Sequence, residues 1–366
     1  MARPFALSNL TSMKILDRYI GRTVAFGVLV VMLVLLALYS FVALVGEMDR
    51  VGVGHYGVVE AMKYVLYTLP KRVYELFPIT ALIGTLVGLG GLAAGSELTA
   101  IRAAGVSITR IGQSVMRVGA LLMVIVALVG ELIAPDLEQY ASHQRAIALG
   151  QQMTMKGRSG FWARDGDNFI NIRRIHPEGR LSDVTIYQLD SNHRLKTQTQ
   201  AAMATYSNGS WQLAGIVRRE ISDDGISIEQ IPNAEWQSLL SPALLEVVMV
   251  RPDSLSIVGL YHYVQYLYDN HLDSSRYVQA MWVKLVDPLT TGVMLLLALP
   301  FIFGPLRSVS LNQRVVAGSL LGISFHIVNR AFHYMGQIYT LNPMFSALFP
   351  TTLFLAVTII WLKRVR

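Results

Sequence analysis

The sequence predicts an α-helical integral membrane protein with six transmembrane helices, three before and three after an inserted all-β, jellyroll-like domain. Three observations indicate this fold. Of the 366 residues, 53% are hydrophobic and only 15% are charged, which is too apolar for a soluble domain of this size. Six apolar runs have the length that crosses a bilayer. A long polar stretch separates the third run from the fourth.

Each apolar run is close to the roughly 20 residues that a helix needs to span the hydrocarbon core. The runs are Thr23–Val45, Leu76–Gly95, Val118–Pro135, Pro288–Leu306, Val315–Ile338 and Phe345–Leu362. We therefore expect four parts: an N-terminal cytoplasmic segment at 1–22, helices one to three at 23–145, the β domain with a return helix at 146–270, and helices four to six at 271–366.

Basic residues give the orientation, because cytoplasmic loops carry an excess of lysine and arginine. Six crossings place four basic groups on one side of the membrane. These groups are Lys14, Arg18 and Arg22; Arg102, Arg110 and Arg117; Arg307 and Arg314; and Lys363, Arg364 and Arg366. That side is expected to be cytoplasmic, and the long middle segment then lies outside the cytoplasm.

The middle segment, about 157–245, has the pattern of β structure. "FWARDGDNFINIRRI" at 161–175 predicts a strand, an Asp-Gly turn and a second strand. More short alternating strands follow, which favours a sandwich or jelly roll over a helical domain. "DSLSIVGLYHYVQYLYDN" at 253–270 then predicts a Ser-capped amphipathic helix that leads back to the fourth transmembrane helix.

Several kinds of chemistry are excluded by missing motifs. The sequence has no G-x-x-x-x-G-K-[ST] phosphate loop, no G-x-S-x-G, no H-E-x-x-H and no cysteine. His262 and His333 lack the partners of a metal site and are better explained as packing or interfacial residues. We assign no catalytic residue, no metal and no cofactor to this chain. The net charge of +7 is explained by membrane flanks, so no nucleic-acid partner is expected.

"SELTAIRAAGVSITR" at 96–110 predicts a short amphipathic helix between the second and third transmembrane helices. Leu98, Ile101 and Gly105 share one face, with Glu97 and Arg102 at its sides. One interpretation is a helix that lies on lipid headgroups. The other is a docking helix that a soluble motor protein pushes, with Glu97 as the charged contact.

Four cations lie near the outer ends of the first three transmembrane helices, against the positive-inside rule. They are Arg50, Lys71, Arg72 and Arg145. Neighbouring acids could neutralise them in salt bridges; these acids are Glu47, Asp49, Glu75 and Glu138. The alternative is a cationic rim that binds the phosphates of an anionic amphiphile.

Two further features keep two interpretations each. Arg330, near the outer end of the fifth helix, either snorkels to the interface or lines a cavity. "ALPFIFGPLRSVSLNQR" at 298–314 is either a loop that returns to the membrane, or a hinge or second docking surface. The glycine-rich 84–95 stretch predicts a close helix-packing face.

Taken together, these motifs resemble the LptF/LptG family of lipopolysaccharide export permeases. The resemblance rests on "SELTAIRAAGVS", "GFWARDGDNFI", "DSLSIVGL" and "FIFGPLRSV", and it covers the chain from Ile15 onward. It implies a multi-pass subunit in the bacterial inner membrane whose β domain is periplasmic. Two positions depart from the family, since Ala43 and Asp49 stand where relatives often carry lysine.

The resemblance also implies a function and partners. A sister permease, LptF, would complete the membrane part of an ABC transporter, and two LptB subunits would hydrolyse ATP with Mg²⁺. Lipopolysaccharide would leave the outer leaflet of the inner membrane and pass to LptC and LptA in the periplasm. The family's coupling helix matches Glu97–Gly105, and its phosphate contacts match Arg50, Lys71 and Arg145.

We expect the acyl chains to lie against apolar walls that include Phe41, Phe325 and Phe332. Two other functions are retained. The chain could be the sister permease LptF or a permease for another lipid. It could instead be a membrane anchor without transport activity whose β domain binds a protein.

Overall fold

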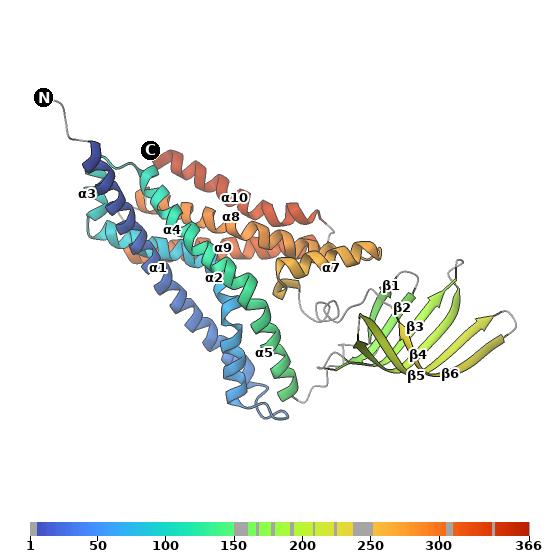
Figure 1. Ribbon diagram of the computed structural model, residues 1–366. Helices are drawn as coiled ribbons and strands as arrows, with labels where there is room; N and C mark the ends of the chain where they lie inside the picture. The colour runs from blue at the N-terminus through green and yellow to red at the C-terminus, as the bar shows by residue number, and fades with distance from the viewer. Residues whose placement is uncertain are drawn as a thin grey trace. The chain divides into compact units, whose positions relative to one another are not determined.

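The computed structural model describes residues 6–149, 160–165, 168–176, 180–190, 194–207, 209–222, 225–236, 252–304, 310–338 and 341–365. The chain divides into two compact units. The helical unit comprises Met1–Asp49, Val65–Tyr140 and Ser275–Arg366, and the sheet unit comprises Arg50–Tyr64 and Ala141–Ser274. Figure 1 shows the elements of both.

Six helices of the described chain are long and apolar enough to cross a membrane. The first three are α1 (Ala6–Met48), α2 (Val58–Ala94), and α4 (Ile108–Leu128) with its continuation through η1 (Val129–Ile133) into α5 (Ala134–Ala148). The last three are α8 (Ser275–Phe303), α9 (Leu311–Ile338) and α10 (Pro343–Val365). The predicted arrangement of three helices before and three after the insertion is therefore confirmed (Figure 1).

The fourth transmembrane helix begins earlier than the sequence predicted. Its expected start, Pro288, lies inside α8, which begins at Ser275. Proline is tolerated inside transmembrane helices because neighbouring groups satisfy the freed backbone carbonyl. As a consequence Lys284 and Asp287 belong to this helix. At its other end the helix stops at Phe303, and the expected loop residues 305–309 lie outside the described residues.

The glycine-rich face of α2 packs against α1, as the sequence predicted. A Cβ atom on Gly84 would lie 2.4 Å from the Cα of Val28, and one on Gly88 would lie 2.8 Å from the carbonyl oxygen of Thr23. Gly27 of α1 has the reciprocal contact, 2.3 Å from the carbonyl oxygen of Gly84. Side chains at these positions would separate the two backbones, which is the usual role of small residues between membrane helices.

The six helices differ greatly in how far they are covered. The most apolar windows of α2 and α8 are each 67% buried, whereas that of α1 is 6% buried. The buried core of the helical unit is built mainly from α2 and α8, with Leu82, Leu86, Met294 and Leu297 at its centre. Helix α1 joins this core through a narrow face, so most of its apolar surface is left to lipid or to another protein.

The third transmembrane helix contains one π-helical turn, η1. Gly130 of this turn packs against the ring of Tyr74, where an added Cβ would lie 2.4 Å from a ring carbon. The same turn carries Glu131, whose carboxylate accepts a 2.5 Å hydrogen bond from the Lys284 ammonium group of α8. Such turns re-aim side chains within a helix and often mark functional positions.

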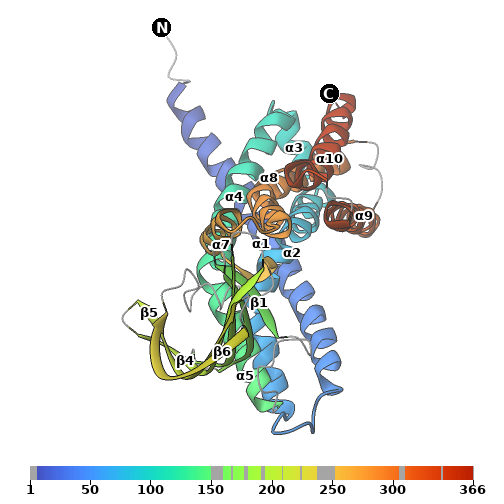
Figure 2. The same cartoon turned by 90° about the vertical axis from the view of Figure 1, so that its right-hand side faces the viewer.

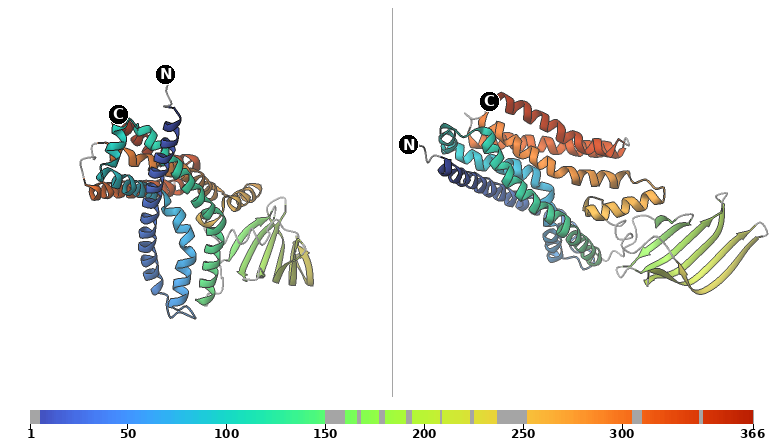
Figure 3. Two further views of the ribbon diagram at one scale, coloured as in Figure 1. Left: turned by 60° about the vertical axis from the view of Figure 1, so that its left-hand side comes forward. Right: turned by 45° about the horizontal axis from the view of Figure 1, so that its top comes forward.

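The sheet unit contains one antiparallel sheet of six strands. They are β1 (Phe161–Asp165), β2 (Asn168–Ile175), β3 (Leu181–Leu189), β4 (Leu195–Ser207), β5 (Ser210–Ser222) and β6 (Gly225–Trp236). The two predicted strands of "FWARDGDNFINIRRI" are confirmed and pair with each other, since Asp165 lies opposite Asn168; residues 166 and 167 of the predicted turn lie outside the described residues. Figure 3 shows the sheet as a curved layer.

Each strand pairs with its neighbours in sequence, in the order β1-β2-β3-β4-β5-β6. The expected inserted β region is thus confirmed. The order of the described strands is that of a meander, while a jelly roll contains strands that cross over between its sheets. Buried residues of the sheet include Ile170, Val184, Ala204 and Trp211.

A helix follows the sheet, as predicted. Helix α7 (Ile257–Asp269) comes after the short η2 (Pro252–Ser254), and the side chain of Ser256 caps it by accepting from the Gly259 amide at 3.1 Å. The Tyr266 hydroxyl donates a 2.9 Å hydrogen bond to the carbonyl oxygen of Arg164 in β1. This bond fixes α7 to the first strand of the sheet unit.

Candidate functional site

The helix between the second and third transmembrane helices is shorter than the sequence predicted. Helix α3 covers Glu97–Ala103 and not the whole of 96–110. It ends because Gly105 adopts a φ of +90°, a left-handed conformation that favours glycine. Ser107 then caps α4 by accepting from the Arg110 amide at 3.3 Å. Residues 108–110 therefore begin the third transmembrane helix. Figure 2 shows α3 near the chain's C-terminal helix α10.

The apolar face of α3 is used within the chain. Leu98 is 3% exposed and belongs to the core of the helical unit, and Ile101 packs against that core. Both residues were predicted as contacts for a motor protein, but their side chains instead fasten α3 to the transmembrane helices. A push on α3 would therefore reach the core directly.

The polar face of α3 is open. Glu97, Arg102 and Gly105 are exposed, and they are the predicted contacts that an approaching protein would meet. The Arg102 guanidinium lies over the Phe303 ring at the end of α8, 5.9 Å from its centroid. This distance matches a cation–π contact, and it links α3 to α8.

Glu97 also has a partner that the sequence did not predict. The hydroxyl of Tyr19, near the start of α1, donates a 2.7 Å hydrogen bond to Glu97 Oε2. The two residues lie 78 positions apart. Both are exposed, so the contact joins α1 to α3 at the surface of the helical unit.

Asp17, two residues earlier, holds α1 to α4. Its carboxylate accepts from the Arg110 guanidinium at 2.7 Å, from the Arg117 guanidinium at 3.0 Å and from the Ser114 hydroxyl at 2.5 Å. Arg110 and Arg117 were expected only as signals of orientation. A single acid near two arginines in a basic flank is the sequence signal that could have identified this cluster.

Lys71 and Arg72, two of the predicted rim cations, are engaged by carboxylates. The Lys71 ammonium group lies 2.7 Å from Glu138 Oε1 and 3.9 Å from Glu75 Oε1. Its side chain is only 10% exposed. Arg72 pairs with Glu75 and lies 4.7 Å over the Tyr39 ring. The salt bridges that the sequence suggested are therefore present for both residues.

The other two predicted rim cations, Arg50 and Arg145, belong to the sheet unit. Arg145 is half-buried, with its guanidinium 4.8 Å over the Tyr64 ring. Arg50 follows α1 and is exposed. The expected rim is thus divided between two units. Arg330 lies exposed near the end of α9, in the helical unit.

The three predicted aromatic wall residues have three different environments. Phe41 is 67% exposed on α1. Phe325 is buried in the core and packs edge-on against Phe354, with ring centroids 5.0 Å apart. Phe332 stacks on Phe349 at 4.6 Å. Only Phe41 offers most of its surface to an acyl chain without a change in packing.

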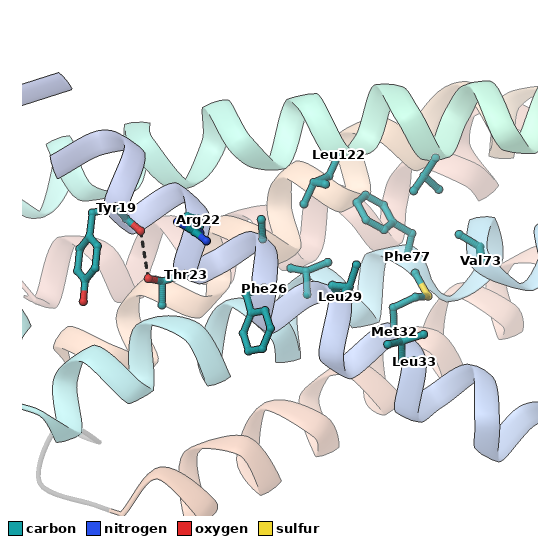
Figure 4. Close-up of a pocket in the computed structure, with 13 residues that line it drawn as sticks. Tyr19, Arg22, Thr23, Phe26, Leu29, Met32, Leu33, Val73, Phe77 and Leu122 are labelled. Carbon is teal, nitrogen blue, oxygen red and sulfur yellow. Dashed lines mark hydrogen bonds between the residues drawn. The ribbon is translucent and has the colours of Figure 1, made fainter. Parts of the chain in front are cut away.

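An apolar groove runs beside α1 and was not predicted. It has a volume of about 750 Å³ and is lined by α1, α2 and α4. Its walls include Phe26, Leu29 and Phe77, and Arg22 is its one charged lining residue (Figure 4). The groove has the size of a pocket for a small amphiphile or an acyl chain.

Comparison with known proteins is consistent across almost the whole chain. Residues 18–364 match the family described as lipopolysaccharide export system permease LptF/LptG. The lipopolysaccharide export system permease protein LptG of Haemophilus influenzae is 37% identical over 349 residues, which cover 95% of this chain and 97% of the relative. LptG of Escherichia coli K12 is 36% identical over 351 residues, with the same coverage.

Proposed function

Because the chain belongs to the LptF/LptG family of lipopolysaccharide export permeases, we propose that it extracts lipopolysaccharide from the inner membrane as a transmembrane subunit of an ABC transporter. The observation that carries this proposal is the family match over 18–364, which includes both groups of transmembrane helices and the sheet between them. Lipopolysaccharide would leave the outer leaflet and pass through the β domain to a periplasmic bridge.

Other subunits supply what this chain lacks. The sequence has no phosphate loop, so ATP and Mg²⁺ are bound by a partner ATPase, an LptB dimer in the cytoplasm. LptF forms the second half of the membrane part, and LptC and LptA receive lipopolysaccharide in the periplasm. The chain itself is a transport subunit and not an enzyme.

Helix α3 is the element through which the ATPase drives transport. Its exposed residues Glu97, Arg102 and Gly105 meet the ATPase, with Glu97 as the main contact. Leu98 and Ile101 carry the force inward because their side chains already pack in or against the core. The division of α3 into an open polar face and a buried apolar face supports this role.

Exposure ranks the cations as phosphate ligands. Arg50 and Arg330 are exposed and can reach a phosphate without losing burial. Lys71 and Arg72 would first have to exchange a carboxylate for the phosphate, and Arg145 would have to leave the Tyr64 ring. Bidentate binding by arginine suits the phosphates of lipopolysaccharide. Exposed apolar residues of α1, such as Phe41, meet the acyl chains.

Two other functions predict different results. A sister permease or a permease for another lipid would copurify with a different subunit or lipid; the relatives named above are LptG proteins, which favours the present assignment. A membrane anchor without transport activity would have no nucleotide-binding partner at all.

The test is reconstitution of the purified complex in vesicles that contain lipopolysaccharide. ATP is supplied on the side of the ATPase, and a soluble periplasmic acceptor is supplied on the side of the β domain. We expect ATP-dependent appearance of lipopolysaccharide on the acceptor. ATP-dependent release of a different lipid would identify another permease, and absence of any copurified ATPase would support the anchor.

A further inference from the structure

We infer that the first turns of α1 transmit the movement of α3 to the rest of this permease, with Tyr19 and Asp17 as the positioning residues. The inference rests on the proposed function, because it takes α3 as the element that an ATPase moves. It adds a route: from Glu97 to Tyr19, and so along α1.

The two residues hold α1 to different elements. Tyr19 donates its hydroxyl to Glu97 of α3 at 2.7 Å. Asp17 accepts three hydrogen bonds from α4, at 2.5 to 3.0 Å. Residues two positions apart on a helix point in different directions, so one short segment of α1 reaches both neighbours. Because α4 begins directly after α3, a movement of α3 acts on both the Tyr19 contact and the Asp17 contact.

Helix α1 is the part of the helical unit best suited to move. Its most apolar window is 6% buried, against 67% for α2 and α8. It contacts α2 through glycines, including Gly27 against Gly84, and its described residues in the buried core are Ile20, Val24 and Val28. Fewer contacts therefore hold α1 than hold α2 and α8.

Movement of α1 would reshape the apolar groove. Tyr19 is itself a lining residue of the groove, together with Phe26 and Leu29 further along α1. Val73 and Phe77 line it from α2, and Leu122 and Val126 from α4. A shift of α1 relative to α2 and α4 therefore changes the width of the groove. Figure 4 shows Tyr19 at one end of this lining.

The Glu97 carboxylate can serve both contacts at once. It accepts one hydrogen bond at Oε2, and an ionised carboxylate has lone pairs for several. Its exposure leaves room for a cationic group of a partner. The Glu97 carboxylate can therefore bind a cationic group of the ATPase and accept the Tyr19 hydrogen bond at the same time. In this way it links the ATPase to α1.

The first experiment compares wild type with Tyr19→Phe, which removes only the hydroxyl, in the reconstituted complex. We expect ATP hydrolysis close to wild type and roughly two- to tenfold less lipopolysaccharide delivered per ATP, the range set by one net hydrogen bond. Tyr334→Phe is the matched control, because Tyr334 is 50% exposed on α9 and Tyr19 is 45% exposed on α1. The control should deliver lipopolysaccharide at the wild-type ratio.

A second comparison tests the route through Glu97. In a Glu97→Leu background, whose side chain offers the Tyr19 hydroxyl no oxygen acceptor, Tyr19→Phe should cause no further broadening of the distance between labels on α1 and α3. Independent, additive broadening would overturn the inference. An Asp17→Asn variant should lower the amount of lipopolysaccharide delivered per ATP, because it weakens the hold of α1 on both arginines.

The third measurement follows the helices themselves. The chain has no cysteine, so Arg18→Cys and Thr99→Cys place spin labels only on α1 and α3. We expect one narrow distance distribution through the ATP cycle, and a broadened one when Tyr19→Phe is added. An unchanged distribution with an unchanged delivery ratio would overturn the inference alone. Failure of the wild-type complex to deliver lipopolysaccharide would overturn the proposed function and the inference with it.

Discussion

The two ends of the helical unit use charged residues in opposite ways. At the α3 end, the exposed residues Tyr19 and Glu97 join α1 to α3, and the half-buried Asp17 holds Arg110 of α4. Near the start of α2, a buried ion pair joins α2 to α5 through Lys71 and Glu138, whose side chains are 10% and 14% exposed. The Tyr19–Glu97 bond is therefore in contact with water, whereas the Lys71–Glu138 pair is largely shielded from it.

This difference separates coupling from stability. An exposed ion pair or hydrogen bond contributes about 1 kcal/mol or less, so its loss lowers stability only slightly. A buried pair is strongly destabilising when one partner is removed, because an uncompensated charge remains. We therefore assign movement to the α3 end and structural integrity to the ion pairs of Lys71 and Lys284.

The largest effect is expected from breaking the buried pair. Lys71→Met leaves Glu138 buried without its cation, and Glu138 Oε2 already lacks a hydrogen-bond partner among the described residues. We expect a loss of about 3 kcal/mol in stability. The measurement is thermal unfolding of the purified complex in detergent.

The double variant Lys71→Met with Glu138→Leu is the control, because it removes both charges and should recover most of the loss. A Lys71→Met protein that unfolds like wild type but no longer binds lipopolysaccharide would contradict the comparison. It would make Lys71 a substrate contact first and a structural residue second.

The contact between α1 and α2 should give the next largest effect. Gly84→Ala places a Cβ 2.4 Å from the Val28 Cα, so the helices must separate, at about 1–3 kcal/mol. Gly91→Ala is the matched control on the same helix, since no atom lies within 4 Å of its added Cβ. Unfolding of both variants in detergent checks the prediction. Equal stability of the two would show that α1 is not held by this glycine face.

The hydrogen bond between the Tyr266 hydroxyl and the Arg164 carbonyl oxygen in the sheet unit is uncharged, so its contribution to stability can be compared with that of the ion pairs. Burial raises the pKa of Tyr266 to about 12, and the nearby Asp165 charge adds to the effect. The Tyr266 hydroxyl therefore remains protonated at neutral pH and donates to the backbone carbonyl oxygen of Arg164. We expect Tyr266→Phe to lower stability by about 1 kcal/mol.

The pH dependence of this contribution has a definite sign. Because the folded-state pKa lies above the ordinary value of 10.0, the stabilisation is complete below pH 10 and is lost as the pH rises toward 12. Unfolding of wild type and Tyr266→Phe should therefore converge over that range. A difference that persists unchanged at high pH would show that packing, and not the hydroxyl, accounts for the effect.

The smallest effect on stability is expected at Arg330. The residue is exposed, so Arg330→Ala should change stability by less than about 0.5 kcal/mol. Stimulation of ATP hydrolysis by lipopolysaccharide should fall if the guanidinium meets phosphate. An unchanged stimulation, measured beside an Arg50→Ala variant that loses it, would leave Arg50 as the main phosphate ligand.

Hydropathy predicted the six helices correctly because it follows from the bilayer, which acts on each segment separately. The start of α8 was missed because the uncharged run begins only after Lys284 and Asp287, although the helix continues through both charges and through Pro288. The length of α3 was overestimated because the same amphipathic pattern runs through Gly105 into α4. Only the positive φ of Gly105 separates the two helices.

The sequence identified residues of the candidate site, but it did not predict which residues contact one another. Glu97 and Lys71 both lie beside apolar runs, and the sequence does not distinguish an exposed charge from a buried one. Tyr19 and Glu97 are 78 positions apart, so their hydrogen bond depends on the packing of α1 against α2. The sequence does not distinguish the exposure of the predicted wall phenylalanines. Phe325 is buried and Phe41 is exposed, because the exposure of each side chain depends on which face of its helix packs against the core.

The account depends above all on α3 as the coupling element. The most direct measurement is assembly and ATP hydrolysis of the copurified complex with Glu97→Ala and Glu97→Lys, beside Thr99→Ala at a neighbouring exposed position. We expect the Glu97 variants to lose the ATPase subunit or its turnover while the chain stays folded, with the stronger loss for lysine, and Thr99→Ala to behave as wild type. Normal assembly and turnover in both Glu97 variants would contradict the account and would make α3 a helix that lies on the lipid surface.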